Sequence, residues 1–233
     1  MKTKSICIIP ARGSSKGIKY KNLSKIAGKS LLEITIEQAL ESKVFDRIFV
    51  SSESKKILSS IQNIDIPFLR PDHLSEDDVH VSEVVIHALK EFQNLGFNYD
   101  NVTMLMPTSP LRTSESINKA MKLFKSSKTD SLVSIENTGK LKTNLRFLND
   151  DKTLRYVSKN IKRNESRQNV DPLYAVNGSI YIAKVSKFLL EQTFHTKNCI
   201  GFTMPAIESV DINNKEDLEL AKIILNYKNN NEQ

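Results

Sequence analysis

Long apolar runs are absent from this sequence, since no stretch approaches the roughly 18 apolar residues that a membrane-spanning helix needs. The chain passes from Lys4 straight into a short apolar segment ending at Pro10, without the apolar core and cleavage site of a secretory signal. Cysteine is scarce, and Cys7 and Cys199 both lie in apolar segments typical of strands. That placement favours small core residues over a disulfide or a metal-binding pair. We therefore expect a cytoplasmic protein with no membrane contact.

Aromatic residues are not interleaved with the basic ones, which matters because the chain is basic. The net charge is +7, from 34 Lys and Arg against 27 Asp and Glu. Such a charge is typical of nucleic-acid-binding proteins, and also of enzymes whose substrates are polyanions. The basic residues are spread along the chain, with no aromatic side chains between them to stack on bases. We expect an anionic small-molecule substrate and no nucleic-acid partner.

Short apolar segments alternate with amphipathic ones along most of the chain. Residues 5–10 are almost continuously apolar, as in a strand buried on both faces of a parallel sheet. Ser30 and Glu33 have the spacing of a capping box, which predicts a helix start. Further strands are predicted at 47–50, 67–69, 102–106, 130–135, 178–183 and 199–204. Further helices are predicted at 53–62, 114–125, 186–192 and 215–227, and one more begins after Ser82 as its N-cap. The alternation predicts an α/β fold, a doubly wound and mostly parallel sheet, in one domain over residues 1–233.

The alternation stops between about residue 136 and residue 174, where the chain becomes polar and basic with scattered apolar residues. Lys159, Lys162, Arg163 and Arg167 form a basic cluster in this stretch. The pattern predicts an inserted hairpin or arm rather than another strand–helix unit. From the residues alone, the cluster is compatible with a solvated arm.

The loop after the first strand is the first candidate site, because open α/β sheets bind ligands beyond the carboxyl ends of their strands. Its glycines and serines, including Gly13 and Ser15, allow backbone N–H groups to turn inward and bind an anion. Arg12, Lys16 and Lys21 add fixed positive charge. The loop lacks the Gly-Lys-Ser/Thr helix start of a Walker motif. It is interpreted as a phosphate-binding loop, the alternative being a glycine-rich surface turn with solvated lysines.

A second loop, Pro107–Arg112, leaves the strand predicted at 102–106. Its two prolines restrict φ and stiffen the turn, while Thr108 and Ser109 offer hydroxyls to a ligand. The alternative is a rigid connection to the next helix, with Ser114 as its cap. Both interpretations stay open.

Asp211 is the strongest metal candidate, at the end of an extended segment that precedes the last helix. Alternate residues of an extended segment face one side, so Asn213 could share an ion with Asp211. Mg²⁺ commonly takes one or two carboxylates in proteins and completes its shell with water and phosphate oxygens. The alternative is that Asn213 or Asn214 caps the helix.

Taken together, these segments resemble the acylneuraminate cytidylyltransferases, the CMP-sialic acid synthetases. The first loop, residues 8–17 with Lys21 and Asn22, and the run Pro107–Arg112 are the most specific pair. Other resembling segments follow in order at 45–52, 69–71, 166–168, 177–181 and 209–212. The resemblance covers nearly the whole chain and implies a Rossmann-like nucleotidyltransferase fold with an inserted dimerisation arm.

The resemblance also implies a reaction, in which CTP and an acidic nine-carbon sugar of the sialic type give a CMP-sugar and pyrophosphate. It implies Mg²⁺ or Mn²⁺ as cofactor and a homodimer as the working form. The implied nucleotide-binding residues are Ala11, Arg12, Gly13, Ser15, Lys16, Lys21, Asn22 and Arg70. The implied sugar-binding residues are Thr108, Ser109, Arg167 and Gln168, the metal ligands Asp211 and Asn213, and the catalytic residues Arg12, Lys21, Arg167 and Asp211.

Two positions depart from the family pattern. Met106 stands where the family commonly has a ligand-binding glutamine, and a thioether donates no hydrogen bond. Asn213 stands where many relatives have a second aspartate. Two alternatives therefore stay open beside the sialic-type reaction: a nucleotidyltransferase for another acidic sugar such as an octulosonate, and a non-catalytic nucleotide-binding homologue. Sialic, legionaminic and pseudaminic acids are not distinguished at this level.

Overall fold

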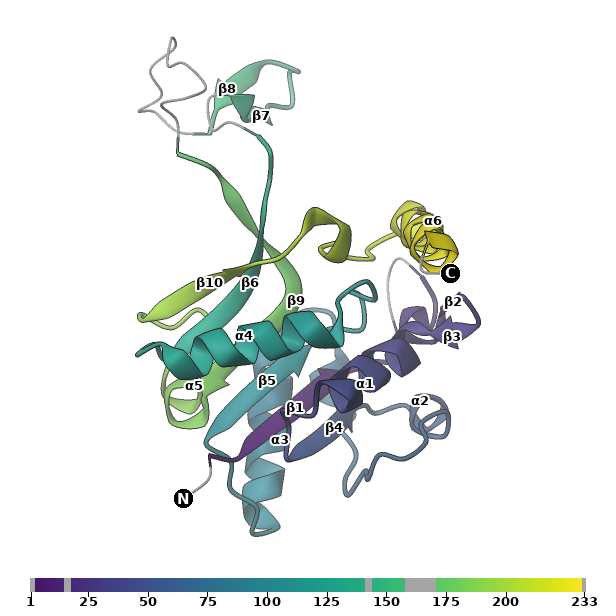
Figure 1. Ribbon diagram of the computed structural model, residues 1–233, viewed down its shortest axis with the longest axis vertical. Helices are drawn as coiled ribbons and strands as arrows, with labels where there is room; N and C mark the ends of the chain where they lie inside the picture. The colour runs from purple at the N-terminus through teal and green to yellow at the C-terminus, as the bar shows by residue number, and fades with distance from the viewer. Residues whose placement is uncertain (1–2, 15–17, 141–143, 158–170, 232–233) are drawn as a thin grey trace.

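A six-stranded sheet forms the centre of the computed structural model, which describes residues 3–14, 18–140, 144–157 and 171–231 (Figure 1). The strand order is β10-β6-β9-β5-β1-β4. The strands are β1 (Ser5–Pro10), β4 (Arg47–Ser51), β5 (Asn101–Leu105), β6 (Ser131–Asn137), β9 (Tyr174–Lys184) and β10 (Cys199–Thr203). Only β9 runs antiparallel to its neighbours in this sheet, so the predicted mostly parallel α/β fold is confirmed.

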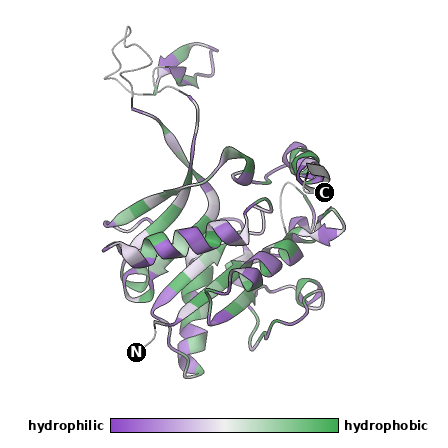
Figure 2. Ribbon diagram, in the orientation of Figure 1, coloured by the Kyte–Doolittle hydropathy of each residue, from purple (hydrophilic) through white to green (hydrophobic). Residues whose placement is uncertain are grey.

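Helices cover both faces of the sheet, as a doubly wound fold requires. On one face, α1 (Leu31–Ser42) and α4 (Ser114–Ser126) bury apolar side chains such as Ile36 and Phe124 against the strands. On the other face, α3 (Val81–Asn94) and α5 (Val185–Glu191) contribute Val85, Phe92 and Phe188 to a second apolar cluster. In Figure 2 the strands are mostly hydrophobic and lie between helices with hydrophilic outer stripes.

The start of α1 shows how local sequence sets an element. The backbone N–H of Glu33 donates to Ser30 Oγ at 3.1 Å, and the N–H of Ser30 donates to Glu33 Oε2 at 2.7 Å. These two bonds satisfy backbone donors that the first helical turn leaves unpaired. The predicted capping box is confirmed.

Two predicted elements around residues 53–69 were wrong. The helix predicted at 53–62 is only α2 (Lys55–Leu58), because the hydroxyls of Ser59 and Ser60 bond backbone carbonyls and compete with helix continuation. Residues 67–69 belong to no strand in the part of the chain that the structure describes. Pro67 has no N–H to give to a ladder.

Two predicted helix caps were displaced by one or two residues. His80, not Ser82, is the N-cap of α3, and its Nδ1 accepts the N–H of Ser82 at 3.2 Å. Thr113, not Ser114, is the N-cap of α4, and its Oγ1 accepts the N–H of Ser116 at 3.1 Å. Both N-caps are polar residues that precede the first apolar position of the helix, so the spacing of apolar residues could not identify them.

Outside the main sheet, short elements complete the chain. Strands β7 (Arg146–Leu148) and β8 (Leu154–Tyr156) pair as an antiparallel hairpin that stands apart from the sheet at the top of Figure 1. The others are η1 (Lys21–Leu23), the pair β2 (Lys25–Ile26) and β3 (Lys29–Ser30), η2 (Asp72–Ser75), η5 (Ala206–Glu208) and α6 (Lys215–Asn231). No helix among the described residues has the length and apolar character needed to cross a membrane.

Candidate active site

A cleft of about 250 Å³ lies beyond the carboxyl ends of β1 and β5. Five residues selected from the sequence line it: Arg12, Lys21, Asn22, Arg70 and Thr108. The remaining lining is largely apolar and consists of Pro10, Leu74, Asp77, Val79, Val81, Val84, Met106 and Pro107. The structure therefore brings the first loop, Arg70 and the start of the second loop to one cavity, at the sheet edge where ligands are expected.

The first loop is held close to the chain that follows β4. Ala11 is fully buried, and its N–H donates to the carbonyl of Ser51 at 2.9 Å. A Cβ at Gly13 would lie 2.9 Å from Ser54 Cβ, so the close approach requires glycine. Asn22 is buried and donates from Nδ2 to the carbonyl of Arg12 at 2.9 Å, which fixes the loop from its other side. Ser15 and Lys16, also expected here, lie outside the described residues.

Both arginines of the cleft pair with carboxylates. The half-exposed guanidinium of Arg12 lies 2.9 Å from Asp77 Oδ1. Arg70 is 4% exposed and donates from Nη2 to Glu53 Oε2 at 2.5 Å. Its Nε has no hydrogen-bond partner among the described residues. Sequence reasoning missed both Asp77 and Glu53. Glu53 was placed in the helix predicted at 53–62, and Asp77 has no glycine, lysine or arginine beside it to indicate a binding loop.

The ammonium of Lys21 links the first loop to the segment before α6. Its Nζ donates to the carbonyl of Ile212 at 2.8 Å, across 191 positions of sequence. The N–H of Ile212 donates in turn to the carbonyl of Thr108 at 2.8 Å. Burial lowers the pKa of Lys21, while the nearby Asp211 carboxylate acts in the opposite direction. Lys21 and Thr108 therefore share one wall of the cleft, and Asp211 lies next to Lys21 but is not among the residues that line the cleft.

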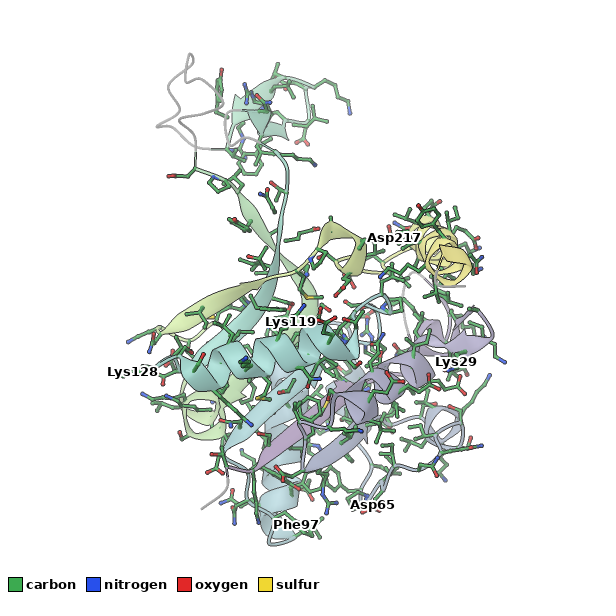
Figure 3. All side chains as sticks on the ribbon, in the orientation of Figure 1. Lys29, Asp65, Phe97, Lys119, Lys128 and Asp217 are labelled. Atoms are coloured by element: carbon green, nitrogen blue, oxygen red, sulfur yellow. The ribbon has the colours of Figure 1, made fainter. Side chains whose placement is uncertain are left out.

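Asp211 and Asn213 are in contact, as the extended-segment argument predicts. Asn213 Nδ2 donates to Asp211 Oδ2 at 3.0 Å. Asn214 Oδ1 accepts the N–H of Asp217 at 2.9 Å, so Asn214 is the residue that caps α6. Asp217 itself is labelled in Figure 3, at the start of that helix. No cluster of three or more His, Cys, Asp or Glu suited to a metal occurs in the described part of the chain. A metal here would need ligands beyond the protein carboxylates.

A buried hydrogen-bond network holds the backbone beside Asp211. Asn177 is 5% exposed; its Oδ1 accepts from Ser134 Oγ at 2.5 Å, and its Nδ2 donates to Ser209 Oγ at 2.9 Å. A Cβ on Gly178, whose φ is +74°, would lie 3.9 Å from Asp211 Cγ. Asn177 therefore joins β6, β9 and the segment that leads to Asp211, a role that the sequence did not reveal.

The second loop divides between the cleft and the core. Thr108 lines the cleft, whereas Ser109 is fully buried and its hydroxyl has no hydrogen-bond partner among the described residues. In this conformation Ser109 does not meet a sugar directly.

Arg112 is also buried, and its Nη1 donates to the carbonyls of Met106 and Ser179 at 3.2 and 2.9 Å. Burial lowers the pKa of Arg112 to about 10. The loop is thus both a rigid connection and a cleft wall. Arg167 and Gln168 fall outside the described residues.

Comparison with known proteins decides the family. The sequence matches the cytidylyltransferase family over residues 6–229. The chain belongs to this family. An N-acylneuraminate cytidylyltransferase of Escherichia coli O18:K1:H7 is 33% identical over 231 residues, which cover 98% of this chain and 54% of that protein. The resemblance read from the first two loops is therefore confirmed.

Other cytidylyltransferases match along their whole length. A CMP-N,N'-diacetyllegionaminic acid synthase of Legionella pneumophila is 32% identical, over 94% of this chain and 95% of that protein. A pseudaminic acid cytidylyltransferase of Campylobacter jejuni is 30% identical, over 98% of each. The chain thus spans about half the length of the E. coli relative, and nearly all of these two.

Solved structures agree on the cytidylyltransferase fold. A CMP:2-keto-3-deoxy-manno-octonic acid synthetase in complex with CTP superposes with a TM-score of 0.69 at 13% identity, over 97% of this chain and all of that one. A 4-diphosphocytidyl-2C-methyl-D-erythritol synthase gives 0.69 at 12% identity, over 97% and 99%. At such identities the likeness concerns the fold, a mixed and mostly parallel sheet covered by helices.

Three cationic side chains line the cleft, with the carboxylate of Asp77 in its lining and that of Asp211 beside it. Arg12, Lys21 and Arg70 supply positive charge and hydrogen-bond donors, and Asp211 lies next to Lys21. Neither histidine nor cysteine is among the residues that line the described cleft. The arrangement can bind and neutralise a polyanion and hold it in position.

Proposed function

We propose that the chain transfers a cytidylyl group from CTP to the anomeric hydroxyl of a nonulosonic acid. The anomeric oxygen bonds to the α-phosphorus, the bond from that phosphorus to the β-phosphate oxygen breaks, and the hydroxyl proton is lost. The products are a CMP-sugar and pyrophosphate. The observation that carries the proposal is the convergence of Arg12, Lys21 and Arg70 on one cleft at the carboxyl edge of the sheet. The names of relatives that match over their full length support it.

The proposed roles follow from charge. A triphosphate carries about four negative charges and the sugar carboxylate one more, so their approach must be offset by cations. Arg12 and Lys21 contact the phosphates and stabilise the departing pyrophosphate. The backbone N–H groups of Ala11 and Gly13 are already bonded to Ser51 and Glu53, so these two residues are proposed to shape the loop. Asn22 holds the loop and Arg70 contacts the nucleotide toward its base. Ser15 and Lys16 are proposed to complete this loop.

The proposed metal is Mg²⁺ or Mn²⁺, held by Asp211 with Asn213 beside it. One carboxylate and a neighbouring amide suit a hard cation whose other ligands come from water and phosphate oxygens. When bound, the ion would neutralise phosphate charge and align the triphosphate. Asn213 turns its amide nitrogen toward Asp211 here, so its oxygen would serve as a ligand only after the amide rotates.

The sugar is proposed to lie against Thr108, and Arg167 and Gln168 are proposed as further sugar-binding residues. Thr108 is adjacent to Ile212 through a backbone hydrogen bond, which places the second loop beside Asp211. Met106 also lines the cleft, so the contact that a glutamine would make there is replaced by an apolar one. The choice among sialic, legionaminic and pseudaminic acids is part of the test below.

A homodimer is proposed as the working form, built through the β7–β8 hairpin. Leu148 and Leu154 pair across this hairpin and are 63% and 65% exposed. Phe147 is 44% exposed. Apolar side chains exposed together on a projecting hairpin are typical of an interaction surface. Light scattering of wild type and of Leu148→Ser/Leu154→Ser measures the mass directly, and a wild-type monomer at all concentrations contradicts the dimer.

The cytoplasm is the proposed location, since the reaction consumes CTP.

Pyrophosphate release with CTP, Mg²⁺ and a panel of acidic sugars tests the proposed function. The panel contains sialic, legionaminic and pseudaminic acids and an octulosonate, with UTP and ATP as nucleotide controls. Release with CTP and a nine-carbon acid supports the proposal. Release with the octulosonate alone supports the alternative sugar. Tight binding of CTP without release under any sugar supports a non-catalytic nucleotide-binding protein.

A further inference from the structure

One carboxylate connects three segments of the cleft wall. Glu53 lies two residues past β4, beside the loop that follows β1. Its Oε1 accepts the N–H of Gly13 at 2.6 Å. Its Oε2 accepts from Arg70 Nη2 at 2.5 Å and from Ser75 Oγ at 2.8 Å. The first loop, the buried arginine and η2 are therefore tied to the same side chain.

Steric constraints make the tie to the first loop specific. A Cβ at Gly13 would lie 2.9 Å from Ser54 Cβ and 3.2 Å from Glu53 Oε1. Any side chain at position 13 must therefore push the loop away from the carboxylate. Ser54 is fixed in turn, because its N–H donates to Ser52 Oγ at 3.1 Å and its hydroxyl accepts from Ile57 N. The loop thus packs against a fixed Ser54, beside the carboxylate of Glu53.

Charge explains the tie to Arg70. A guanidinium that is 96% buried is costly unless a carboxylate faces it, and Glu53 is that carboxylate. Burial raises the pKa of Glu53, but hydrogen bonds from Arg70, Gly13 and Ser75 outweigh it and lower the pKa overall. Glu53 therefore stays ionised at neutral pH. It occupies Nη2 of Arg70, while the buried Nε has no partner among the described residues.

We propose that Glu53 is a positioning residue of the nucleotide site. It holds the first loop, through the N–H of Gly13, and the guanidinium of Arg70 in place before the nucleotide enters. The proposal rests on the proposed function in one respect, that the cleft binds CTP. Glu53 itself touches neither the sugar nor the reacting atoms, so its loss weakens CTP binding and leaves the sugar's KM unchanged.

Three substitutions separate the contacts of Glu53. Glu53→Gln keeps its size but removes the charge and turns an N–H₂ group toward a donor. Glu53→Asp keeps the charge with a shorter reach. Ser75→Ala removes only the bond to η2. The matched control is Glu37→Gln, which removes a carboxylate from an exposed pair with Lys29 at 2.6 Å, away from the nucleotide cleft.

Calorimetry of CTP binding without sugar is the main measurement, beside steady-state kinetics and thermal melting. Glu53→Gln is expected to weaken CTP binding by about tenfold, the effect of one lost charged contact, with kcat within about twofold. Preference for CTP over UTP falls as well, because Arg70 is no longer held toward the base. Glu53→Asp recovers part of the affinity, and Glu37→Gln matches wild type.

Each outcome decides a separate question. Wild-type CTP affinity in Glu53→Gln overturns the proposal, and so does a loss of kcat in step with melting temperature, which marks a merely structural role. Wild-type protein that binds CTP but releases no pyrophosphate defeats the proposed reaction and leaves the role of Glu53 intact. Wild-type protein that does not bind CTP defeats both. An unfolded Glu53→Gln is resolved by Glu53→Asp, which must then show weaker CTP binding with an unchanged KM for the sugar.

Discussion

The two walls of the cleft are held by different kinds of contact. Around Arg12 and Arg70 the contacts are ionic, to Asp77 and Glu53. Around Asp211 they are neutral and buried, through Asn177 and its serine partners. A cation paired with a carboxylate can exchange that partner for a phosphate, whereas a neutral network has no equivalent exchange to make. We infer that the side of the cleft with Arg12 and Arg70 binds a polyanion, whereas the side beside Asp211 keeps its structure.

Energetics sharpen this contrast. A half-exposed ion pair such as Arg12–Asp77 contributes at most about 1 kcal/mol to stability. Leaving one buried polar group unsatisfied costs about 1–3 kcal/mol. Loss of the half-exposed Arg12 pair should therefore alter ligand binding with little effect on stability, whereas breaking the neutral network should do the reverse.

The largest expected effect is on stability, in Asn177→Leu. The substitution keeps the number and branching of the side-chain heavy atoms but leaves the buried hydroxyl of Ser134 without its acceptor and removes the bond to Ser209. We expect the free energy of unfolding to fall by about 3 kcal/mol. Urea denaturation measures it, with Asn118→Leu on the exposed side of α4 as control, expected within about 0.5 kcal/mol of wild type. Equal losses in both variants would remove the distinction between the walls.

Next come Arg12→Ala and Lys21→Ala, which remove cations from the cleft. Each should lower kcat/KM for CTP by about a hundredfold, since a charged contact to phosphate contributes up to about 3 kcal/mol. The proteins should still fold, because the Arg12 pair is half-exposed and Lys21 contributes a single bond to Ile212. Pyrophosphate release and far-UV circular dichroism measure the two quantities. Full turnover in either variant contradicts the phosphate assignment.

A smaller effect of opposite sign is expected for Asp77→Asn. Removing this carboxylate frees Arg12 from its partner in the empty cleft and removes a negative charge near the triphosphate. CTP should bind about threefold more tightly, equivalent to one exposed ion pair. The control is Asp65→Asn, which breaks the exposed pair with Arg47 at 3.3 Å; neither residue lines the cleft, and Asp65 is labelled in Figure 3. Weaker binding in Asp77→Asn would mean that Asp77 belongs to the nucleotide site.

The smallest effect concerns acid stability and Glu53. Because the pKa of Glu53 in the folded protein lies below its ordinary value of 4.5, its ionised form stabilises the fold above that pH. The contribution is lost as the pH falls below 4.5 and through the lowered pKa. Wild type should therefore lose more stability than Glu53→Gln on acidification. The urea midpoint of unfolding, measured for both proteins at neutral pH and at a series of pH values below 4.5, tests this. Parallel curves would contradict the ionic tie to Arg70.

Much of the fold could be predicted from sequence because its signals are local. The apolar run of β1 and the pair Ser30 and Glu33 need no distant partner to be recognised. The first loop could be placed in a site because it follows a buried strand. In contrast, Glu53 was missed: its partners Gly13 and Arg70 lie 40 and 17 positions away, and periodicity assigned it to a helix.

The second loop shows a different limit. Thr108 and Ser109 are neighbours with similar hydroxyls, yet one lines the cleft and the other is fully buried. Their directions depend on how the turn packs, including the bond from Arg112 to the carbonyl of Met106. Asn177 lies within a segment that resembles the family, but no role could be predicted for it, because its partners come from β6 and from the chain before α6.

The contact between Lys21 and the Ile212 carbonyl also has a consequence for synthesis of the protein. It spans 191 positions, so the first loop is made early and receives this partner only when most of the chain has left the ribosome. The apolar faces of β1, β4 and α1 can pack long before then, because they are close in sequence. Nucleotide affinity should consequently be among the last properties that a nascent chain acquires.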